Sequence, residues 1–296
     1  MITIRQSSAR WAPAHNHPKA DVDVLLPTCN RPGELAVTLA GLAAQDGPAF
    51  RLVLSDQSEG LAGWEHGPVA AILRVLRVQG TSVDLLRHLP RRGLAEHRQF
   101  LLDHSSADQV LFLDDDVWLE PGSLARMTKA LEQLGCGFVG MAPQGLSYVD
   151  DRRPSDTCHF EPWQGPVTPE RIRPNQAGFE RWPLHSAANL VHLSEELQLQ
   201  EGQWIPYKVA WIGGCTMYRR TALESVGGFK FWNELPPEHS GEDVAVQWRV
   251  MECYGGAGIL PSGAVHLESP TTIPNRPVEA FDVVFKEAQA NRLRSK

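Results

Sequence analysis

The sequence predicts an α/β protein with a mainly parallel sheet that is flanked by helices. Apolar runs at residues 22–26, 51–54 and 109–113 alternate with segments that have apolar residues at helical spacing. Strands that alternate with helices of this kind are typical of βαβ units. Because right-handed crossovers bring the loops after parallel strands to one edge, polar residues at those strand ends should share one crevice.

The expected elements follow one another along the chain. Strands are expected at residues 22–26, 51–54, 83–89 and 109–113, and helices at 34–45, 69–78 and 94–104. After a long proline-rich stretch, the sequence predicts a strand at 209–212, a short helix opened by a capping box at Thr221, and a helix at 244–254 opened from Ser240. Final strands are expected at 258–260 and 264–267, with an amphipathic helix at 281–296.

Composition narrows the class of protein. The chain has 296 residues and a formal net charge of −7, which gives no basis for nonspecific nucleic-acid binding. No apolar stretch is long enough to span a membrane, and residues 1–20 lack the apolar core of a signal peptide. The five cysteines have no metal or redox spacing. We therefore expect a cytoplasmic protein, free or peripheral to the inner face of a membrane, of unknown oligomeric state.

Three consecutive aspartates, Asp114, Asp115 and Asp116, follow the strand expected at 109–113. Adjacent carboxylates repel one another, and a divalent cation relieves that repulsion. Oxygen ligands suit Mg²⁺ or Mn²⁺. A solvated acidic turn before the helix at Ser123 also fits the pattern.

The segment from residue 143 to residue 206 differs from the rest of the chain in composition and periodicity. It contains eight prolines and three tryptophans, and its periodicity is weak. A long irregular segment inside a domain is usually functional or mobile. We expect a lid or an acceptor platform that is partly mobile and orders over the site when ligands bind, with a disordered insertion as the alternative.

Several short motifs accompany the aspartates in a fixed order. They are Pro27-Thr28-Cys29-Asn30-Arg31, Ser55-Asp56-Gln57-Ser58, a stretch from Arg92 to Gln99, Gly213-Gly214, Gly227-Gly228-Phe229 and Glu242-Asp243. Together they resemble the P-T-x-N-R, D-D-G-S, G-x-x-x-A-R-N, D-x-D, G-G, G-G-F and E-D series of inverting GT-A glycosyltransferases of the "family two" group. His97 and Gln99 depart from the usual residues of the third motif.

The resemblance implies a nucleotide-sugar donor held by a metal. Asp116 would be the direct ligand, and Asp114 would bind the ribose or reach the metal through water. Asp115 would be turned toward the sheet. His266 is similar to a histidine that completes the metal site in some GT-A enzymes, although a core or surface histidine fits equally well.

The remaining donor contacts are also implied by the resemblance. They involve Thr28, Asn30, Arg31, Arg98, Gly213 and Gly214. Asp56 would accept a hydrogen bond from the imide of uracil, thymine or guanine, which favours UDP- or dTDP-sugars. Arg98 would contact the base or the diphosphate, or would be a surface arginine. The two glycines would press against the donor sugar, or would form a tight turn.

Inversion requires a carboxylate that takes a proton from an acceptor hydroxyl of a saccharide, a lipid-linked compound or another molecule. Asp243 is the expected base, and Glu242 would bind sugar or acceptor hydroxyls. Acids in a first helical turn also stabilise the helix dipole. The processive Q-x-x-R-W motif is replaced by Gln247-Trp248-Arg249, which favours transfer of one sugar per encounter.

The expected organisation is an N-terminal extension (residues 1–20), a single GT-A domain (21–280) and a tail (281–296). The domain divides into a nucleotide-binding half (21–142), the irregular lid or acceptor insertion (143–208) and an acceptor and catalytic half (209–280). Two alternatives stay open. One is a non-catalytic nucleotide-sugar-binding module. The other is a phosphatase of the haloacid dehalogenase type, although Trp118 stands where that motif needs Thr or Val.

Overall fold

A computed structural model describes residues 20–200 and 202–285, and its centre is an eight-stranded sheet. The strand order is β3-β2-β1-β4-β8-β6-β10-β7. The first four neighbours are parallel, whereas β8 is antiparallel to β4 and β6, and β7 is antiparallel to β10. The strand bounds are β1 Val22–Thr28, β2 Phe50–Asp56, β3 Ser82–Arg87, β4 Gln109–Leu113, β6 Phe138–Gly140, β7 Ile205–Tyr207, β8 Cys215–Arg219 and β10 Gly256–Leu260. The predicted mainly parallel α/β sheet is confirmed.

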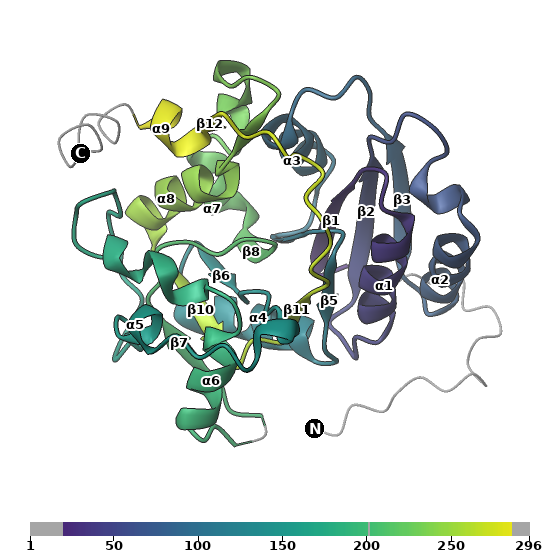
Figure 1. Ribbon diagram of the computed structural model, residues 1–296. Helices are drawn as coiled ribbons and strands as arrows, with labels where there is room; N and C mark the ends of the chain where they lie inside the picture. The colour runs from purple at the N-terminus through teal and green to yellow at the C-terminus, as the bar shows by residue number, and fades with distance from the viewer. Residues whose placement is uncertain (1–19, 201, 286–296) are drawn as a thin grey trace.

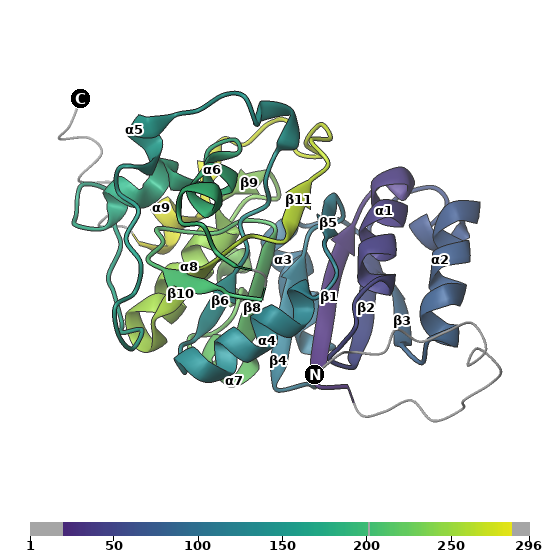
Figure 2. The same ribbon diagram turned by 90° about the horizontal axis from the view of Figure 1, so that it is seen from below.

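Helices cover both faces of this sheet (Figures 1 and 2). On one face lie α1 (Pro32–Ala43), α2 (Gly67–Val78) and α4 (Ser123–Leu134), which bury leucines such as Leu39, Leu73 and Leu131. On the other face lie α3 (Leu94–Asp103) and α8 (Glu242–Tyr254), and α7 (Arg220–Ser225) packs beside α8. Each face thus has its own apolar core, as expected for strands that are buried on both sides.

The elements of the first half match their predicted positions, whereas two predictions in the second half are wrong. Residues 209–212 are not a strand, because their main-chain groups bond to α8: Trp248 Nε1 donates to the Ala210 carbonyl at 2.9 Å. No capping box opens α7 or α8. The residue before α7 is Arg219, and the residue before α8 is Gly241, which adopts a left-handed φ of 72° that disfavours a side chain.

The described residues between 143 and 208 are folded, and several of them pack into the core. They form η3 (Leu146–Tyr148), α5 (Pro154–Thr157), η4 (Phe179–His185), α6 (Asn189–Glu196) and β7. Leu184, Leu190 and Tyr207 are fully or almost fully buried in the core beside α8. The alternative of a disordered insertion is therefore wrong for the described residues. A role in acceptor binding stays a prediction.

Two small sheets anchor a segment that crosses the molecule. Strand β11 (Ala264–His266) pairs antiparallel with β5 (Val117–Leu119), and β12 (Val278–Glu279) pairs parallel with β9 (His239–Ser240). Residues 267–277, which we call the strap, run between β11 and β12 (Figure 1). The strap therefore bridges the two halves of the sheet.

The chain continues into the core beyond the expected boundary at residue 280. Helix α9 (Ala280–Val284) buries Phe281, whose ring lies 5.2 Å from that of Trp248. The domain thus includes the first turn of the expected tail, and residues 286–296 of the predicted helix lie outside the described residues. No helix within the described ranges has the length and apolar character needed to cross a membrane.

Candidate active site

The three consecutive aspartates lie at the carboxyl end of β4, and Asp115 and Asp116 are both buried. The Thr28 hydroxyl donates to Asp115 Oδ2 at 2.7 Å, and Arg31 Nη1 lies 3.2 Å from Asp115 Oδ1. Burial raises the pKa of the Asp115 carboxyl to about 7. Its side chain contacts Thr28 at the end of β1 and Arg31 just before α1, and it also lines the pocket. A direct contact of Asp115 with a cofactor stays a prediction.

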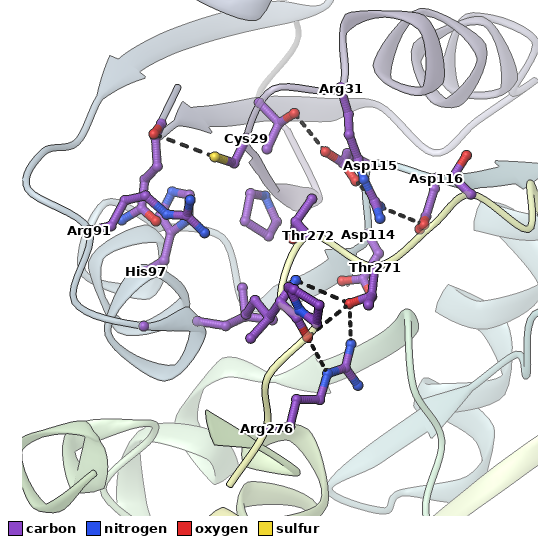
Figure 3. A pocket seen from close by; sticks show the side chains of 18 of the residues that line it. Cys29, Arg31, Arg91, His97, Asp114, Asp115, Asp116, Thr271, Thr272 and Arg276 are labelled. Carbon is purple, nitrogen blue, oxygen red and sulfur yellow. Dashed lines mark hydrogen bonds and ion pairs between the residues drawn. The ribbon is translucent and has the colours of Figure 1, made fainter. Parts of the chain in front are cut away.

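Asp116 shares one oxygen between two basic groups. Its Oδ2 accepts from Arg31 Nη1 at 2.6 Å (Figure 3) and lies 3.6 Å from His266 Nε2. Its main-chain carbonyl accepts the N–H of Leu267 at 2.9 Å. Burial, and then the charge of Asp114, raise the pKa of the Asp116 carboxyl. The site therefore favours a positive charge beside Asp116.

The residues around Asp116 fit a small divalent cation that also binds phosphate oxygens. The distance of 3.6 Å from Asp116 to His266 is close to the span of two ligands that lie about 2.1 Å from a shared ion. Within the described part of the chain, no three His, Cys, Asp or Glu side chains form a ready-made cation site. Mg²⁺ sites commonly use one or two carboxylates and take further ligands from substrate phosphates and water. Asp114, whose side chain is 34% exposed, lines the same pocket.

Arg98 joins this acidic cluster to the start of α8. Its Nη2 donates to Asp114 Oδ1 at 2.9 Å, and its Nε lies 3.3 Å from Glu242 Oε1. Burial alone would lower the pKa of Arg98, but Asp114 and Glu242 raise it overall. The alternative of a surface arginine is therefore wrong, because Arg98 is 5% exposed. Arg98 is not among the pocket-lining residues, so its contact with a base or diphosphate stays a prediction.

Asp243, next to Glu242 in the first turn of α8, has a different environment. Its Oδ1 accepts the N–H of Val244 at 2.8 Å, and we find no ion pair with Asp243 among the described residues. Burial, and then the neighbouring charge of Glu242, raise the pKa of the Asp243 carboxyl to about 7. A carboxylate with this pKa is suited to accept a proton near neutral pH.

The loop with the two glycines faces Asp243 on one side and Asp114 on the other. A methyl group on Gly213 would lie 3.3 Å from Asp243 Oδ2 and 3.1 Å from the Trp211 ring. Gly214 has a φ of +71°, and a methyl group there would lie 3.5 Å from Asp114 Oδ2. Its carbonyl accepts the N–H of Asp114 at 2.9 Å. A side chain at either glycine would therefore crowd Trp211 or Pro143 and approach one of the two acidic groups.

Gln247 holds the glycine loop in place, a role that the sequence does not indicate. Its Oε1 accepts the N–H of Ile212 at 2.8 Å, and its Nε2 donates to the Ile212 carbonyl at 2.5 Å. The side chain is fully buried. In the sequence, Gln247 draws attention only because it departs from Q-x-x-R-W. No local pattern could show that it contacts a loop 35 residues away.

Asp56 does not have the environment that the sequence predicts. The backbone N–H groups of Ser58 and Gly63 donate to its two carboxylate oxygens, and the residue is 0% exposed. It holds its own loop and does not line the pocket. In the motif Ser55-Asp56-Gln57-Ser58, Asp56 stands at the second aspartate of D-D-G-S, and Ser55 stands at the first. The prediction that Asp56 contacts the nucleobase is therefore wrong, because its two carboxylate oxygens are bound by its own loop.

Gln57 takes the place beside the pocket that was expected for Asp56. It is 4% exposed, it lines the pocket, and its buried Nε2 has no hydrogen-bond partner among the described residues. Asn30, also expected at the nucleotide, does not line the pocket. Its backbone has a left-handed φ of 57°, and its N–H donates to Ser58 Oγ at 2.8 Å. Asn30 thus shapes the loop that positions Thr28 and Arg31.

A pocket of about 620 Å³ lies in front of the aspartates. Thr28, Arg31, Gln57 and the three aspartates line it, together with residues of the strap (Figure 3). Two further arginines that the sequence analysis missed, Arg91 and Arg276, also face it. In the sequence, Arg91 could have been noticed as the basic residue directly before the motif that runs from Arg92 to Gln99. Arg276 lies in the strap, where no motif marked it.

The sheet order and the acidic strand end define a GT-A fold of the nucleotide-diphosphate-sugar transferase class. Residues 23–227 match the family described as Glycosyl transferase family 2, so the chain belongs to that family. This match gives no support to the haloacid-dehalogenase alternative. The chain is 29% identical over 130 residues to the galactofuranosyltransferase GlfT2 of Mycolicibacterium smegmatis, a similarity that covers 42% of this chain and 20% of GlfT2.

Solved structures share the same fold. The mannosyltransferase PcManGT from Pyrobaculum calidifontis, in complex with GDP-Man and Mn²⁺, has a TM-score of 0.53 and 17% identity over 93% of this chain and 64% of that one. S. aureus TarS 1–349, in complex with UDP-GlcNAc, has a TM-score of 0.51 and 15% identity over 92% and 66%. The chain thus spans at most about two thirds of these relatives. At such identities the likeness shows the fold alone.

Proposed function

We propose that this protein transfers one sugar from a nucleoside diphosphate sugar to an acceptor hydroxyl, with inversion and with the help of Mn²⁺ or Mg²⁺. The observation that carries the proposal is the link made by Arg98. It joins Asp114, at the pocket of the strand-end aspartates, to Glu242, which precedes Asp243 on α8. A charged donor site and a candidate proton acceptor therefore lie next to each other. Inverting transfer needs this arrangement for a single in-line displacement.

The donor diphosphate would lie over the strand-end aspartates. Asp116, His266 and Asp114 would hold the cation, which supplies charge neutralisation for the departing nucleoside diphosphate. Arg31, Arg91 and Arg276 add permanent positive charge around the same pocket. This charge distribution supports a diphosphate as the ligand.

The base of the donor would lie at the other end of the pocket, beside Gln57. Its side-chain amide can donate to a carbonyl and accept from an imide N–H, so it is complementary to uracil or thymine. Guanine offers a similar pair of groups. We therefore favour UDP- and dTDP-sugars, as the sequence did, but with Gln57 in place of Asp56.

The acceptor would approach Asp243 along Trp211. The rings of Trp211 and Trp182 lie 5.3 Å apart, and Trp211 Nε1 donates to the Trp182 carbonyl at 3.3 Å. Trp182, which lies within residues 143–208, thus supports an aromatic surface beside the proposed catalytic base Asp243. Such a surface suits the apolar face of a sugar. Gln247 and Trp248 bond to the loop that carries Trp211. The order Gln247-Trp248-Arg249, which departs from Q-x-x-R-W, is what favours transfer of one sugar per encounter.

A panel of nucleotide sugars with Mn²⁺ tests this proposal. UDP- or dTDP-sugars should raise the Tm in a concentration-dependent manner, whereas CDP- and ADP-sugars should not. The hydrolysis or transfer product of the active donor, analysed by NMR as it forms, should have the inverted anomeric configuration. Stabilisation without any turnover over a broad acceptor panel would favour the non-catalytic alternative, and a retained configuration would exclude the single displacement.

A further inference from the structure

Arg31 occupies the oxygen that a metal ion would need. It lies just before α1, and its side chain is 13% exposed. Its Nη1 bridges Asp115 Oδ1 and Asp116 Oδ2 at 3.2 and 2.6 Å. The same Asp116 Oδ2 lies 3.6 Å from His266 Nε2. A cation held by Asp116 and His266 would therefore compete with Arg31 for one carboxylate oxygen.

Arg31 also contacts the strap. Its Nη2 donates to the carbonyl of Pro270, and the neighbouring Ser269 hydroxyl donates to Glu34 Oε1 on α1 at 2.9 Å. The strap is tied to the acidic cluster a second time, because the Leu267 N–H donates to the Asp116 carbonyl. A displacement of the Arg31 side chain would thus change the contacts of both the acidic cluster and the strap.

Electrostatics predict where Arg31 goes when a divalent cation arrives. Two positive groups that share one carboxylate oxygen repel each other strongly in a partly buried site. A diphosphate brings the negative charge that a guanidinium binds with two parallel hydrogen bonds. Arg31 lines the pocket and so can reach such a ligand.

On these grounds we propose that Arg31 holds the place of the metal at Asp116 and makes the binding of metal and nucleoside diphosphate depend on each other. Bare metal must displace Arg31 from Asp116 without compensation. When the diphosphate binds as well, its oxygens accept hydrogen bonds from the Arg31 guanidinium. Asp116 Oδ2 then becomes available to the metal. This inference rests on the proposed function, because it needs a metal and a diphosphate in this pocket.

The substitution Arg31→Gln gives two effects of opposite sign. Binding of Mn²⁺ alone, followed by the EPR signal of free Mn²⁺, should tighten by about 10-fold because the competing charge is gone. Binding of UDP in the presence of saturating Mn²⁺, followed by calorimetry, should weaken by about 10-fold because the diphosphate loses a cation. Arg31→Lys keeps the charge and should restore weak binding of bare Mn²⁺.

Arg152→Gln is the matched control, since Arg152 is exposed and pairs with Glu195 away from the pocket. It should change neither affinity. If Arg31→Gln leaves the affinity for bare Mn²⁺ unchanged or lowers it, while the wild type binds UDP and Mn²⁺ together, the inference is wrong and the proposed function stands. If the wild type binds no Mn²⁺ even with UDP, both the inference and the metal-assisted function fail.

Discussion

Two groups of acidic residues face each other across the site, and they differ in their cationic partners. The strand-end acids, Asp114, Asp115 and Asp116, all lie within ion-pair distance of an arginine. In the helix-start pair, Glu242 has an arginine within ion-pair distance, whereas Asp243 forms no ion pair within residues 20–200 and 202–285 and accepts the backbone N–H of Val244. The pKa of Asp115 is raised to about 7 as well, so the cationic partners make the difference. Acids that pair with cations suit charge binding, and a buried acid without an ion pair suits proton transfer.

The comparison also explains why two acids of one helical turn can have different roles. Glu242 directs its carboxylate toward Arg98, and its charge in turn raises the pKa of Asp243. Asp243 Oδ2 lies beside Gly213, where an added methyl group would be 3.3 Å away. Glu242 thus raises the pKa of its neighbour, and under the proposed function Asp243 would face the acceptor.

Replacing the acid without an ion pair should give the largest effect. Asp243→Asn keeps the size of the side chain but removes the proton acceptor, so turnover should fall by about 10²–10⁴-fold. The affinity for UDP with Mn²⁺ should stay close to that of the wild type. Steady-state kinetics and calorimetry measure the two quantities. The exposed Asp151→Asn serves as a control, and near-normal turnover of Asp243→Asn would remove it as the base.

Replacing an acid that pairs with a cation should act on binding. Asp116→Asn weakens the cation site, so the Kd for UDP in the presence of Mn²⁺ should rise by about 10- to 100-fold, the usual effect of losing a charged contact. With EDTA in place of Mn²⁺, the difference between variant and wild type should shrink. If the wild type binds UDP with the same Kd with and without metal, the proposed role of the metal in donor binding is wrong.

The glycine loop offers a smaller, structural test of the space between the two acidic groups. Gly214→Ala places a side chain at a φ of +71°, 3.1 Å from Pro143, and should reduce the free energy of unfolding by about 1–2 kcal/mol. Gly33→Ala in α1 is the matched control. No atom lies within 4 Å of its added methyl group, so this substitution should be neutral or slightly stabilising. Equal denaturation midpoints for the two variants would show that the loop tolerates a side chain.

Much of the first half could be predicted from the sequence because its signals are local. Apolar runs and helical spacing gave β1 to β4 with α1 to α3, and the run of aspartates marked the end of β4. The second half depends on contacts that no local pattern encodes. Residues 209–212 read as a strand, yet their hydrogen bonds go to side chains of α8.

In the candidate site, too, the residues marked by local motifs could be predicted, and those placed by distant contacts could not. Thr28, Arg31 and the strand-end acids were expected at the pocket and line it. Asp56 was misjudged because a carboxylate at a strand end can serve a ligand or its own loop, and only the geometry of Ser58 and Gly63 decides between these roles. The strap could not be predicted, since residues 267–277 have no periodicity and reach the site through pairing with distant strands.

The pH dependence of kcat/KM tests the central claim, that Asp243 is a proton acceptor whose pKa is set by burial and by Glu242. The base must be ionised, so kcat/KM of the wild type should rise with pH through an apparent pKa of about 7 and then level off. In Glu242→Gln a neighbouring negative charge is gone, and this rise should move to lower pH even if the maximal rate falls. A rise that keeps its position in Glu242→Gln, or a profile that is flat between pH 5 and 8 in the wild type, would contradict the assignment.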